Sequence, residues 1–475
     1  MKKWREFMIY DVAVLGGGVV GCAILNKLTR IGKKTVLIEK NSDVATETSK
    51  ANSGIVHAGF DAMPGTLKAK LNVRGAELMP KLCRELGVKL VNNGAVVIGN
   101  DQKTLEDLLA RGIQNGVTGL EILDREKLSK LLPAITDEIT CGLLAKTSCI
   151  VSPYKLTIAL AEEAVLNGAD VVFNYDTKAC NKVDNYYVLD DGKTKISAYK
   201  IVIACGGEHN QIANILGAKQ YDIKYRRGEY FLLEKNSCDI NGLTVFPMPS
   251  KDSKGVLVSY TVSNNIIVGP TSILCDNNLT VTTNEGLDDI ASKVGHMLSN
   301  VNLKKNIRIF SGVRTLVGHD FVIEKDENNP DFVDVTGICS PGLSASPAIA
   351  EEVVKLLGFD LTEKTNLVRR KECPKIAELS SDELSKLIKK DPNFGKIVCR
   401  CEMVSVAEII DAVNSPLKPI SLDGIKRRTR AGMGRCQGGF CFMKVMEIIS
   451  KVRGISIDEV TKENMNSRII VGNIK

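Results

Sequence analysis

A glycine-rich turn near the start of the chain narrows the possible folds more than any other feature. The turn follows an apolar run at residues 10–15 and reads Gly16-Gly17-Gly18-Val19-Val20-Gly21. In such a G-x-G-x-x-G turn, Gly16 allows the tight bend, Gly18 lets the backbone approach a pyrophosphate, and Gly21 lets the following helix pack on the strand. The sequence therefore predicts a Rossmann-type α/β unit that binds a dinucleotide.

The second strand of this unit, at residues 35–40, ends in Glu39 and Lys40. A carboxylate at this point accepts hydrogen bonds from ribose hydroxyls and disfavours a 2′-phosphate. Two later turns, Gly206-Gly207 and the segment 337–345, favour FAD over NAD, because both would bring backbone close to one extended cofactor. On spacing alone, each of these turns also fits an ordinary connection between a strand and a helix.

The chain has 475 residues, more than the roughly 250–300 that one core usually serves. Residues 218–309 read mainly as short strands separated by turn residues, which predicts an inserted antiparallel sheet. The predicted fold class is α/β and α+β, with a Rossmann-type FAD-binding domain, this inserted substrate domain and a small C-terminal domain. The predicted boundaries are nucleotide-binding segments 8–85, 150–217 and 310–365, substrate-domain segments 86–149 and 218–309, a helical linker 371–395 containing SDELSKLIKK, and a C-terminal domain 396–475, with residues 1–370 as the oxidoreductase part.

Composition excludes several classes of protein. The net charge is +7, but acidic residues are interspersed with the basic ones, which argues against nucleic-acid binding. The amino terminus lacks the apolar region of a signal peptide, and no apolar run of about 18 residues is present to span a bilayer. We therefore expect a cytoplasmic protein that reaches a membrane only through partner subunits.

Four of the 14 cysteines form two close pairs near the carboxyl end, Cys399 with Cys401 and Cys436 with Cys441. Short-spaced thiolates flanked by glycine turns are typical of a [2Fe-2S] cluster. A structural zinc site or four unligated thiols are the alternatives, although C-x-C with C-x₄-C is unusual for zinc. The basic residues around these pairs could offset a negative cluster, form a docking face or simply be solvated; they are Lys426, Arg427, Arg428, Arg430 and Arg435.

The chain resembles the D-amino-acid-oxidase-type FAD superfamily over about residues 8–365. The segments that carry the resemblance are YDVAVLGGGVVG with Glu39, ETSKANSGIVHAGF, RRGEYFLL, SGVRTLVG and GICSPGLSASPAIAEEV. Within the superfamily, the resemblance is to L-2-hydroxyglutarate oxidase and to the FAD subunit of anaerobic glycerol-3-phosphate dehydrogenase. It implies an extended FAD and a substrate held against the flavin beneath an antiparallel sheet.

This resemblance also assigns site residues. It places Arg314 against an anionic substrate, with Arg227 and Tyr230 as further candidates and His57 near the flavin. A salt bridge between lobes is the alternative role for Arg314, and a structural role the alternative for His57. Because Arg226 and Arg227 are adjacent on a strand, at most one of them can face the pocket. The residues predicted to contact FAD are Gly16, Gly18, Gly21, Glu39, Lys40, Thr48, Ser49, Ser53, Gly54, Gly206, Gly207, Gly342, Leu343, Ser344 and Ala345.

Residues 396–453 resemble the bacterioferritin-associated-ferredoxin type of [2Fe-2S] domain, with Cys399, Cys401, Cys436 and Cys441 as ligands. FAD together with a one-electron cluster implies a dehydrogenase that oxidises a small anionic hydroxy substrate and exports electrons to another protein. The favoured substrate is glycerol 3-phosphate. A 2-hydroxy acid such as L-2-hydroxyglutarate, or a noncatalytic electron-transfer subunit, remains an alternative.

Overall fold

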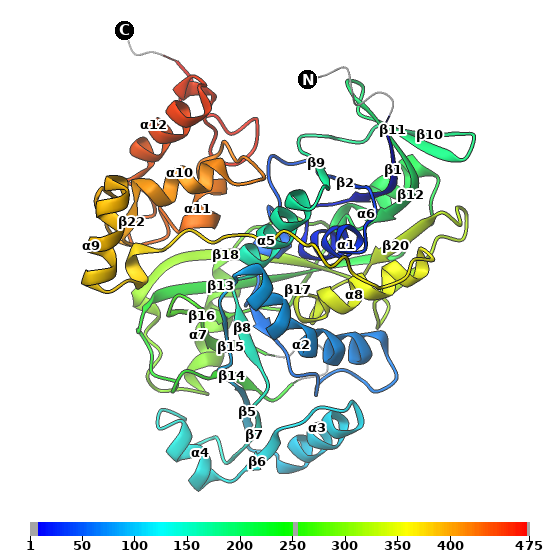
Figure 1. Ribbon diagram of the computed structural model, residues 1–475. Helices are drawn as coiled ribbons and strands as arrows, with labels where there is room; N and C mark the ends of the chain where they lie inside the picture. Colours follow the sequence, from blue (N-terminus) through cyan, green and yellow to red (C-terminus); the bar gives the residue numbers. More distant parts are fainter. Residues whose placement is uncertain (1–7, 250–254, 473–475) are drawn as a thin grey trace.

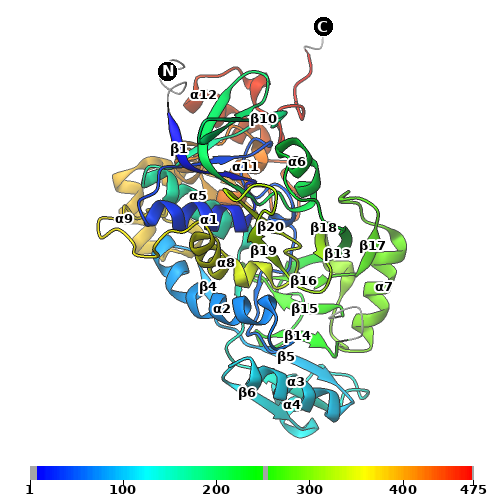
Figure 2. The same cartoon turned by 90° about the vertical axis from the view of Figure 1, so that its right-hand side faces the viewer.

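The computed structural model describes residues 8–249 and 255–472. They form two lobes built on sheets and a smaller helical domain beside the first lobe (Figures 1 and 2). Residues 1–7, on which the expectation about export depends, lie outside the described residues, as do 250–254 and 473–475. Among the helices that are described, none is long and apolar enough to cross a membrane.

The first lobe contains an eight-stranded sheet with a parallel centre. β1 pairs in parallel with β12 on one side and with β2 on the other. The strands are β1 (Ile9–Leu15), β2 (Thr35–Ile38), β9 (Asp170–Val172), β10 (Ala179–Val183), β11 (Tyr186–Asp190), β12 (Lys195–Ile203), β19 (Val322–Lys325) and β20 (Phe332–Thr336).

Helices cover both faces of this sheet. Alternation along β1 sends Val12 and Val14 into one hydrophobic core and Ala13 and Leu15 into another. The first core is closed by α1 (Val19–Arg30), α2 (Leu67–Leu86), α5 (Pro153–Leu166) and α8 (Gly342–Leu356), and the second by α6 (His209–Leu216). This arrangement places the amino end of α1 at the carboxyl edge of the sheet, where ligands of α/β proteins bind.

The second lobe contains a nine-stranded sheet that is antiparallel except where β14 meets β5. Its strands come from residues 95–145, 223–275 and 306–317. They are β5 (Ala95–Gly99), β6 (Leu120–Leu123), β7 (Cys141–Ala145), β13 (Ile223–Lys235), β14 (Thr244–Pro247), β15 (Leu257–Tyr260), β16 (Asn265–Gly269), β17 (Ile273–Cys275) and β18 (Asn306–Val317). The helices of this lobe are α3 (Gln102–Gln114), α4 (Arg125–Leu131) and α7 (Asn284–Gly295).

The predicted fold class is confirmed, but one expected boundary crosses a strand. Residue 310 falls inside β18, which pairs with β13 from Asn306 to Val317. The long pairing places residues 310–317 in the second sheet. A smaller sheet has the strand order β3 (Ile55–Val56), β8 (Cys149–Val151) and β4 (Leu90–Val91).

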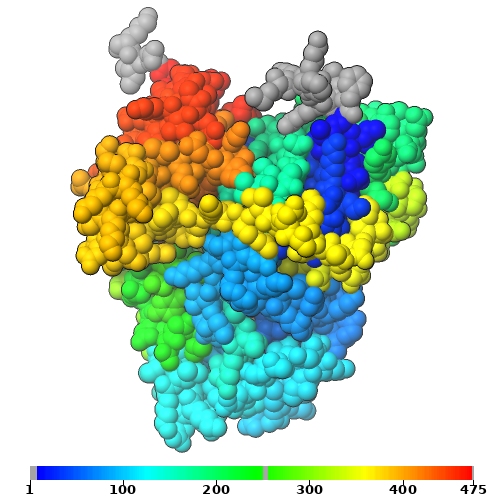
Figure 3. Space-filling model, viewed as in Figure 1, coloured from blue at the N-terminus to red at the C-terminus, as the bar shows by residue number. Residues whose placement is uncertain are grey.

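The carboxyl-terminal region has a core of its own. A long connection runs across the surface from α8 to α9 (Ser381–Lys390), the expected amphipathic helix (Figure 3). Its amino end is fixed by reciprocal hydrogen bonds between Ser380 and Glu383. The domain beyond contains β21 (Ile397–Cys399), β22 (Val404–Ser405), α10 (Val406–Asn414), α11 (Leu422–Thr429) and α12 (Phe442–Arg453).

The basic segment before the second cysteine pair is largely an interdomain contact. The carboxylate of Asp43, in the first lobe, accepts hydrogen bonds from Arg428 at 2.7 Å and Arg427 at 3.1 Å. Arg428 also donates to Glu162 on α5 at 3.3 Å. Burial favours the neutral acid, but Arg428 and Arg427 hold the pKa of Asp43 below its ordinary value. The two arginines therefore form neither a docking face nor a solvated surface.

Replacing Asp43 with asparagine should lower the free energy of unfolding by about 3–5 kcal/mol, because it removes the buried carboxylate that Arg427 and Arg428 share. Arg428 keeps Glu162 and Arg427 keeps Glu463 as a second partner, so the loss should lie at the lower end of this range. Urea unfolding of the holoprotein measures this loss. The control is Glu126→Gln, which breaks an exposed pair with Lys130 and should cost less than about 1 kcal/mol. Equal, small losses in both variants would contradict the interdomain role of Asp43.

Candidate functional site

A cavity of about 780 Å³ lies between the two large lobes. It is lined by the glycine turn after β1 and by residues of β13 and β18. Its volume is in the usual range for small-molecule and cofactor sites, about 300–1,000 Å³. The predicted nucleotide site and the predicted substrate site are thus parts of one cavity.

The glycine turn has the backbone geometry that its sequence predicts. Gly16 has φ = +106°, and a Cβ there would lie 2.4 Å from the carbonyl oxygen of Ala204. A Cβ on Gly21 would lie 2.0 Å from the carbonyl oxygen of Gly16, so Gly21 serves helix packing and does not line the cavity. Gly18 precedes α1 and, with Val19, lines the cavity at the helix amino terminus. Amides and the helix dipole there favour a phosphate.

Glu39 lies beside this turn. Its carboxylate accepts hydrogen bonds from the amides of Gly17 at 2.6 Å and Asn41 at 2.8 Å. Burial raises the pKa of Glu39, and these amides oppose the shift in part. Lys40 also lines the cavity and pairs with Glu208. An anion-binding helix end beside a carboxylate suited to ribose hydroxyls fits the adenosine and pyrophosphate part of FAD.

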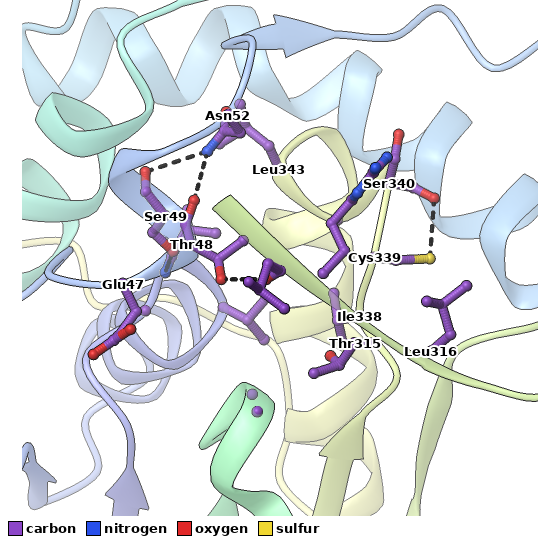
Figure 4. A pocket seen from close by; sticks show the side chains of 18 of the residues that line it. Glu47, Thr48, Ser49, Asn52, Thr315, Leu316, Ile338, Cys339, Ser340 and Leu343 are labelled. Atoms are coloured by element: carbon purple, nitrogen blue, oxygen red, sulfur yellow. Dashed lines mark hydrogen bonds between the residues drawn. The ribbon is translucent and has the colours of Figure 1, made fainter. Parts of the chain in front are cut away.

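The loop at residues 47–54 forms one wall of the cavity. Ser49 Oγ accepts a hydrogen bond from the amide of Val19 at 2.8 Å, and Thr48 Oγ1 donates to the carbonyl of Val313 at 2.6 Å. Figure 4 shows Thr48, Ser49 and Asn52 on one side of the pocket and Leu316, Ile338, Cys339 and Ser340 on the other. The loop therefore connects the pyrophosphate end of the cavity to β18.

Tyr230 and Arg314 lie close together in the wall of the cavity. Tyr230 stacks on Phe310 with ring centroids 4.9 Å apart, and Arg314 Nη2 donates to the carbonyl of Thr271 at 3.1 Å. Burial raises the pKa of Tyr230, while the charge of Arg314 and a hydrogen bond with Ser53 oppose the shift. His57 lines the same cavity, and its ring centroid is 5.8 Å from that of Phe246.

Not every predicted site residue reaches the cavity. Ser344 and Ala345 are buried in α8, where Ser344 Oγ accepts a hydrogen bond from the amide of His57 at 2.8 Å. Arg227 instead pairs with the buried Glu229 at 2.9 Å. The predicted residues that line the cavity are Gly16, Gly18, Glu39, Lys40, Thr48, Ser49, Ser53, Gly54, His57, Gly206, Gly207, Tyr230, Arg314, Gly342 and Leu343.

The four cysteines near the carboxyl end meet in two pairs. Cys401 Sγ lies 3.8 Å from Cys436 Sγ, and the thiols of Cys399 and Cys441 are hydrogen-bonded to each other. Two sulfurs on one tetrahedral metal, with bonds of about 2.3 Å, lie about 3.8 Å apart. A [2Fe-2S] cluster takes two cysteines at each iron, whereas zinc takes all four at one ion. In the part of the chain that the structure describes, no three metal-binding side chains surround one point.

Backbone amides approach these sulfurs. The hydrogen bond with Cys441 and the amides of Gly432 and Glu402 lower the pKa of Cys399 to about 6. A Cβ on Gly434 would lie 2.3 Å from the Cβ of Cys401, so the turn can hold only glycine there. Amide hydrogen bonds stabilise thiolate charge, and two such pairs fit a [2Fe-2S] cluster.

Comparison with known families agrees with both sites. Residues 11–356 match the family described as FAD dependent oxidoreductase. The chain belongs to this family. A second match, over residues 397–451, is to the BFD-like [2Fe-2S] binding domain. The cofactors of this oxidoreductase are FAD and a [2Fe-2S] cluster, as its sequence predicts.

Similar proteins act on small hydroxy compounds. A glycerol 3-phosphate dehydrogenase of Caloramator mitchellensis is 41% identical and aligns with 98% of this chain and 99% of its own. FAD-bound L-alpha-glycerophosphate oxidase from Mycoplasma pneumoniae superposes with a TM-score of 0.74 at 31% identity, covering 78% of this chain and all of that one. The mitochondrial L-2-hydroxyglutarate dehydrogenase of Arabidopsis thaliana is 27% identical over 72% of this chain and 82% of its own.

Sequence reasoning did not select several charged residues that line the oxidoreductase cavity, and Arg226 is one of them. Arg226, half-buried on β13, lines the cavity with Tyr230 and Arg314. The signal was available, because residues 226, 228 and 230 lie on the same face of a strand and Arg227 does not. If Tyr230 faces the cavity, Arg226 must face it too, because both lie on the same face of the strand. Arg227 must then face away from the cavity.

Proposed function

We propose that this oxidoreductase oxidises sn-glycerol 3-phosphate to dihydroxyacetone phosphate, passing a hydride to the flavin and releasing electrons through the [2Fe-2S] cluster to a partner protein. The observation that carries the proposal is Arg314, which lines the same cavity as the glycine turn and lies beside Tyr230. A guanidinium keeps its charge at any pH and forms paired hydrogen bonds with a phosphate. The similarity over nearly the whole chain to a glycerol 3-phosphate dehydrogenase supports this substrate.

Three side chains that line the cavity have separate roles in the proposed reaction. Arg314 binds the phosphate, and His57 takes the proton of the secondary hydroxyl as the carbinol is oxidised. Tyr230, held by Ser53 and Phe310, forms the wall beside Arg314 and excludes water from it. When bound, FAD accepts the hydride from the carbinol carbon. Loss of that hydride and of the hydroxyl proton leaves the ketone.

The surface around the cysteines suits electron release. Cys401 is exposed, and Phe440, which precedes Cys441, is 92% exposed. When bound, the cluster carries one electron at a time to the acceptor. An electron-accepting protein would therefore bind at the surface that Cys401 and Phe440 form. A cytoplasmic location, with membrane association only through partner subunits, belongs to the same proposal.

Anaerobic mixing of the cluster-loaded holoprotein with glycerol 3-phosphate should bleach the flavin absorbance within one turnover, followed by reduction of the cluster. Stopped-flow absorbance measures both steps, since flavin and cluster absorb differently. L-2-hydroxyglutarate, the substrate named for more distant relatives, provides the comparison and should react slowly or not at all. Bleaching by the hydroxy acid alone would replace the proposed substrate, and silence with both would favour an electron-transfer subunit.

A further inference from the structure

A second, small cavity lies where four parts of the chain meet. Its volume is about 60 Å³. Because one water needs roughly 10–15 Å³, this cavity has room for several waters or one small ion. Its wall combines residues of α2 and α5 in the first lobe, residues 262–263 of the second lobe, the connection at 370–378 and the carboxyl-terminal domain. A ligand bound there would contact all four parts.

The wall of this small cavity carries an excess of positive charge. Its two acidic residues are both close to Lys375, which lies 2.5 Å from Glu372 and 3.9 Å from Glu378. Its three arginines are paired with carboxylates that do not line it, those of Glu162 and Glu402. The basic residues of the wall are Lys89, Lys155, Arg370, Lys375, Arg428 and Arg430.

Lys155 is the half-buried lysine in the first turn of α5. Among the residues that the structure describes, no carboxylate oxygen lies within 4 Å of its ammonium. The positive end of the helix dipole favours anions and opposes a cation at this position. Burial and the charge of Lys375 lower the pKa of Lys155 to about 8. An anion in the cavity would offset each of these effects.

The amino end of α5 also has a hydroxyl group without a hydrogen bond. Ser152 is the N-cap residue, where a serine side chain commonly accepts a hydrogen bond from an amide of the first turn. Ser152 makes no such bond and is only 5% exposed, and its Oγ has no hydrogen-bond partner within the described part of the chain. It lines the small cavity together with Lys155. A helix amino terminus, a hydroxyl donor and an ammonium thus converge, as anion-binding sites require.

We propose that this cavity binds a phosphate group, either inorganic phosphate or the phosphate of a small monoester, and that the bound phosphate holds the carboxyl-terminal domain against the two lobes. A tetrahedral phosphate accepts several hydrogen bonds around one atom, which suits donors that come from different segments. Ser152 and Lys155 belong to the first lobe, and Arg428 and Arg430 to the carboxyl-terminal domain. The small cavity and the oxidoreductase cavity have no lining residue in common, so this site is separate from the substrate site.

Lys155→Gln removes the unpaired charge and keeps most of the side chain. Calorimetric titration of the FAD- and cluster-loaded protein with inorganic phosphate measures the dissociation constant. The Arg314→Ala background removes the contribution of the proposed substrate site. In that background, Lys155→Gln should raise the constant about 30-fold or more, because a charge-assisted contact is lost. Ser152→Ala should raise it by a smaller factor, and the control Lys386→Gln, at an exposed position on α9, should leave it unchanged.

Thermal unfolding distinguishes a phosphate site from a purely structural lysine. In the same background without phosphate, Lys155→Gln should unfold at the same temperature as the protein that keeps Lys155, or higher. Phosphate should raise the unfolding temperature only where Lys155 is present. It should also slow amide hydrogen exchange in residues 370–378 and 422–430.

Titration with glycerol 2-phosphate identifies the source of the phosphate group. Tighter binding of inorganic phosphate would identify the free ion as the ligand, and equal or tighter binding of the ester would identify a monoester. No phosphate binding in the Arg314→Ala protein, an unchanged affinity in Lys155→Gln, or a loss of stability in Lys155→Gln that is the same with and without phosphate would overturn the proposed site. Amide exchange that phosphate does not change would overturn its interdomain role.

Discussion

Replacing Arg314 with alanine should lower kcat/KM for glycerol 3-phosphate by about 10²–10³-fold, with FAD still bound. Removing one partner of a buried charge-assisted pair costs about 2–5 kcal/mol, and a 10²–10³-fold loss, about 2.7–4.1 kcal/mol, lies within that range. FAD should remain because the residues that favour its pyrophosphate belong to the glycine turn and the amino end of α1, which the substitution does not change. Anaerobic flavin reduction and the flavin-to-protein ratio measure the two effects separately.

The strand that carries Arg314 also supplies a control for this prediction. Arg308 is an exposed arginine on β18 that donates a hydrogen bond to Gln437 of the carboxyl-terminal domain. The control variant, Arg308→Ala, removes this side chain. Flavin reduction by the substrate should be unaffected in that variant. If Arg314→Ala loses stability and FAD together while binding substrate normally, Arg314 is a structural link between lobes.

The local patterns were the most predictable part of this protein. The glycine turn, Glu39 and the four cysteines each impose a backbone or chemical requirement that is visible within a few residues. Gly16 and Gly21 illustrate this, because a Cβ at either position would overlap backbone atoms. The two-sheet fold class followed from strand periodicity and turn spacing in the same way.

Contacts between distant segments were not predictable. Arg428 reads as a surface cation, yet its partner Asp43 lies 385 residues away in the sequence. Only the packing of the carboxyl-terminal domain on the first lobe explains why Arg427 and Arg428 are buried. The pairing of Arg226 with Arg314 depends in the same way on the register of β13 and β18. A single sequence predicts which residues share one face of a strand, but it does not predict which other strand pairs with it.

Replacing Cys436 with serine should abolish electron transfer to the partner protein while leaving reduction of the flavin by the substrate intact. Serine removes one of the four predicted cluster ligands, so the [2Fe-2S] absorbance and its reduced-state paramagnetic signal should disappear. Reduction of the flavin by glycerol 3-phosphate should persist, because Arg314 and His57 are unchanged. Turnover with a one-electron protein acceptor should fall about 100-fold or more.

Cys436 is a better choice for this experiment than Cys399 or Cys441. Those two side chains belong to the hydrophobic core of the carboxyl-terminal domain, so their substitution would also disturb its packing. Cys436 lies outside that core, paired with the exposed Cys401. Cys373→Ser, which changes a half-buried cysteine of the linker, should keep both cofactors and full turnover. Acceptor turnover that survives in Cys436→Ser after loss of the cluster would mean that electrons leave the flavin directly, and the cluster would then have a structural role.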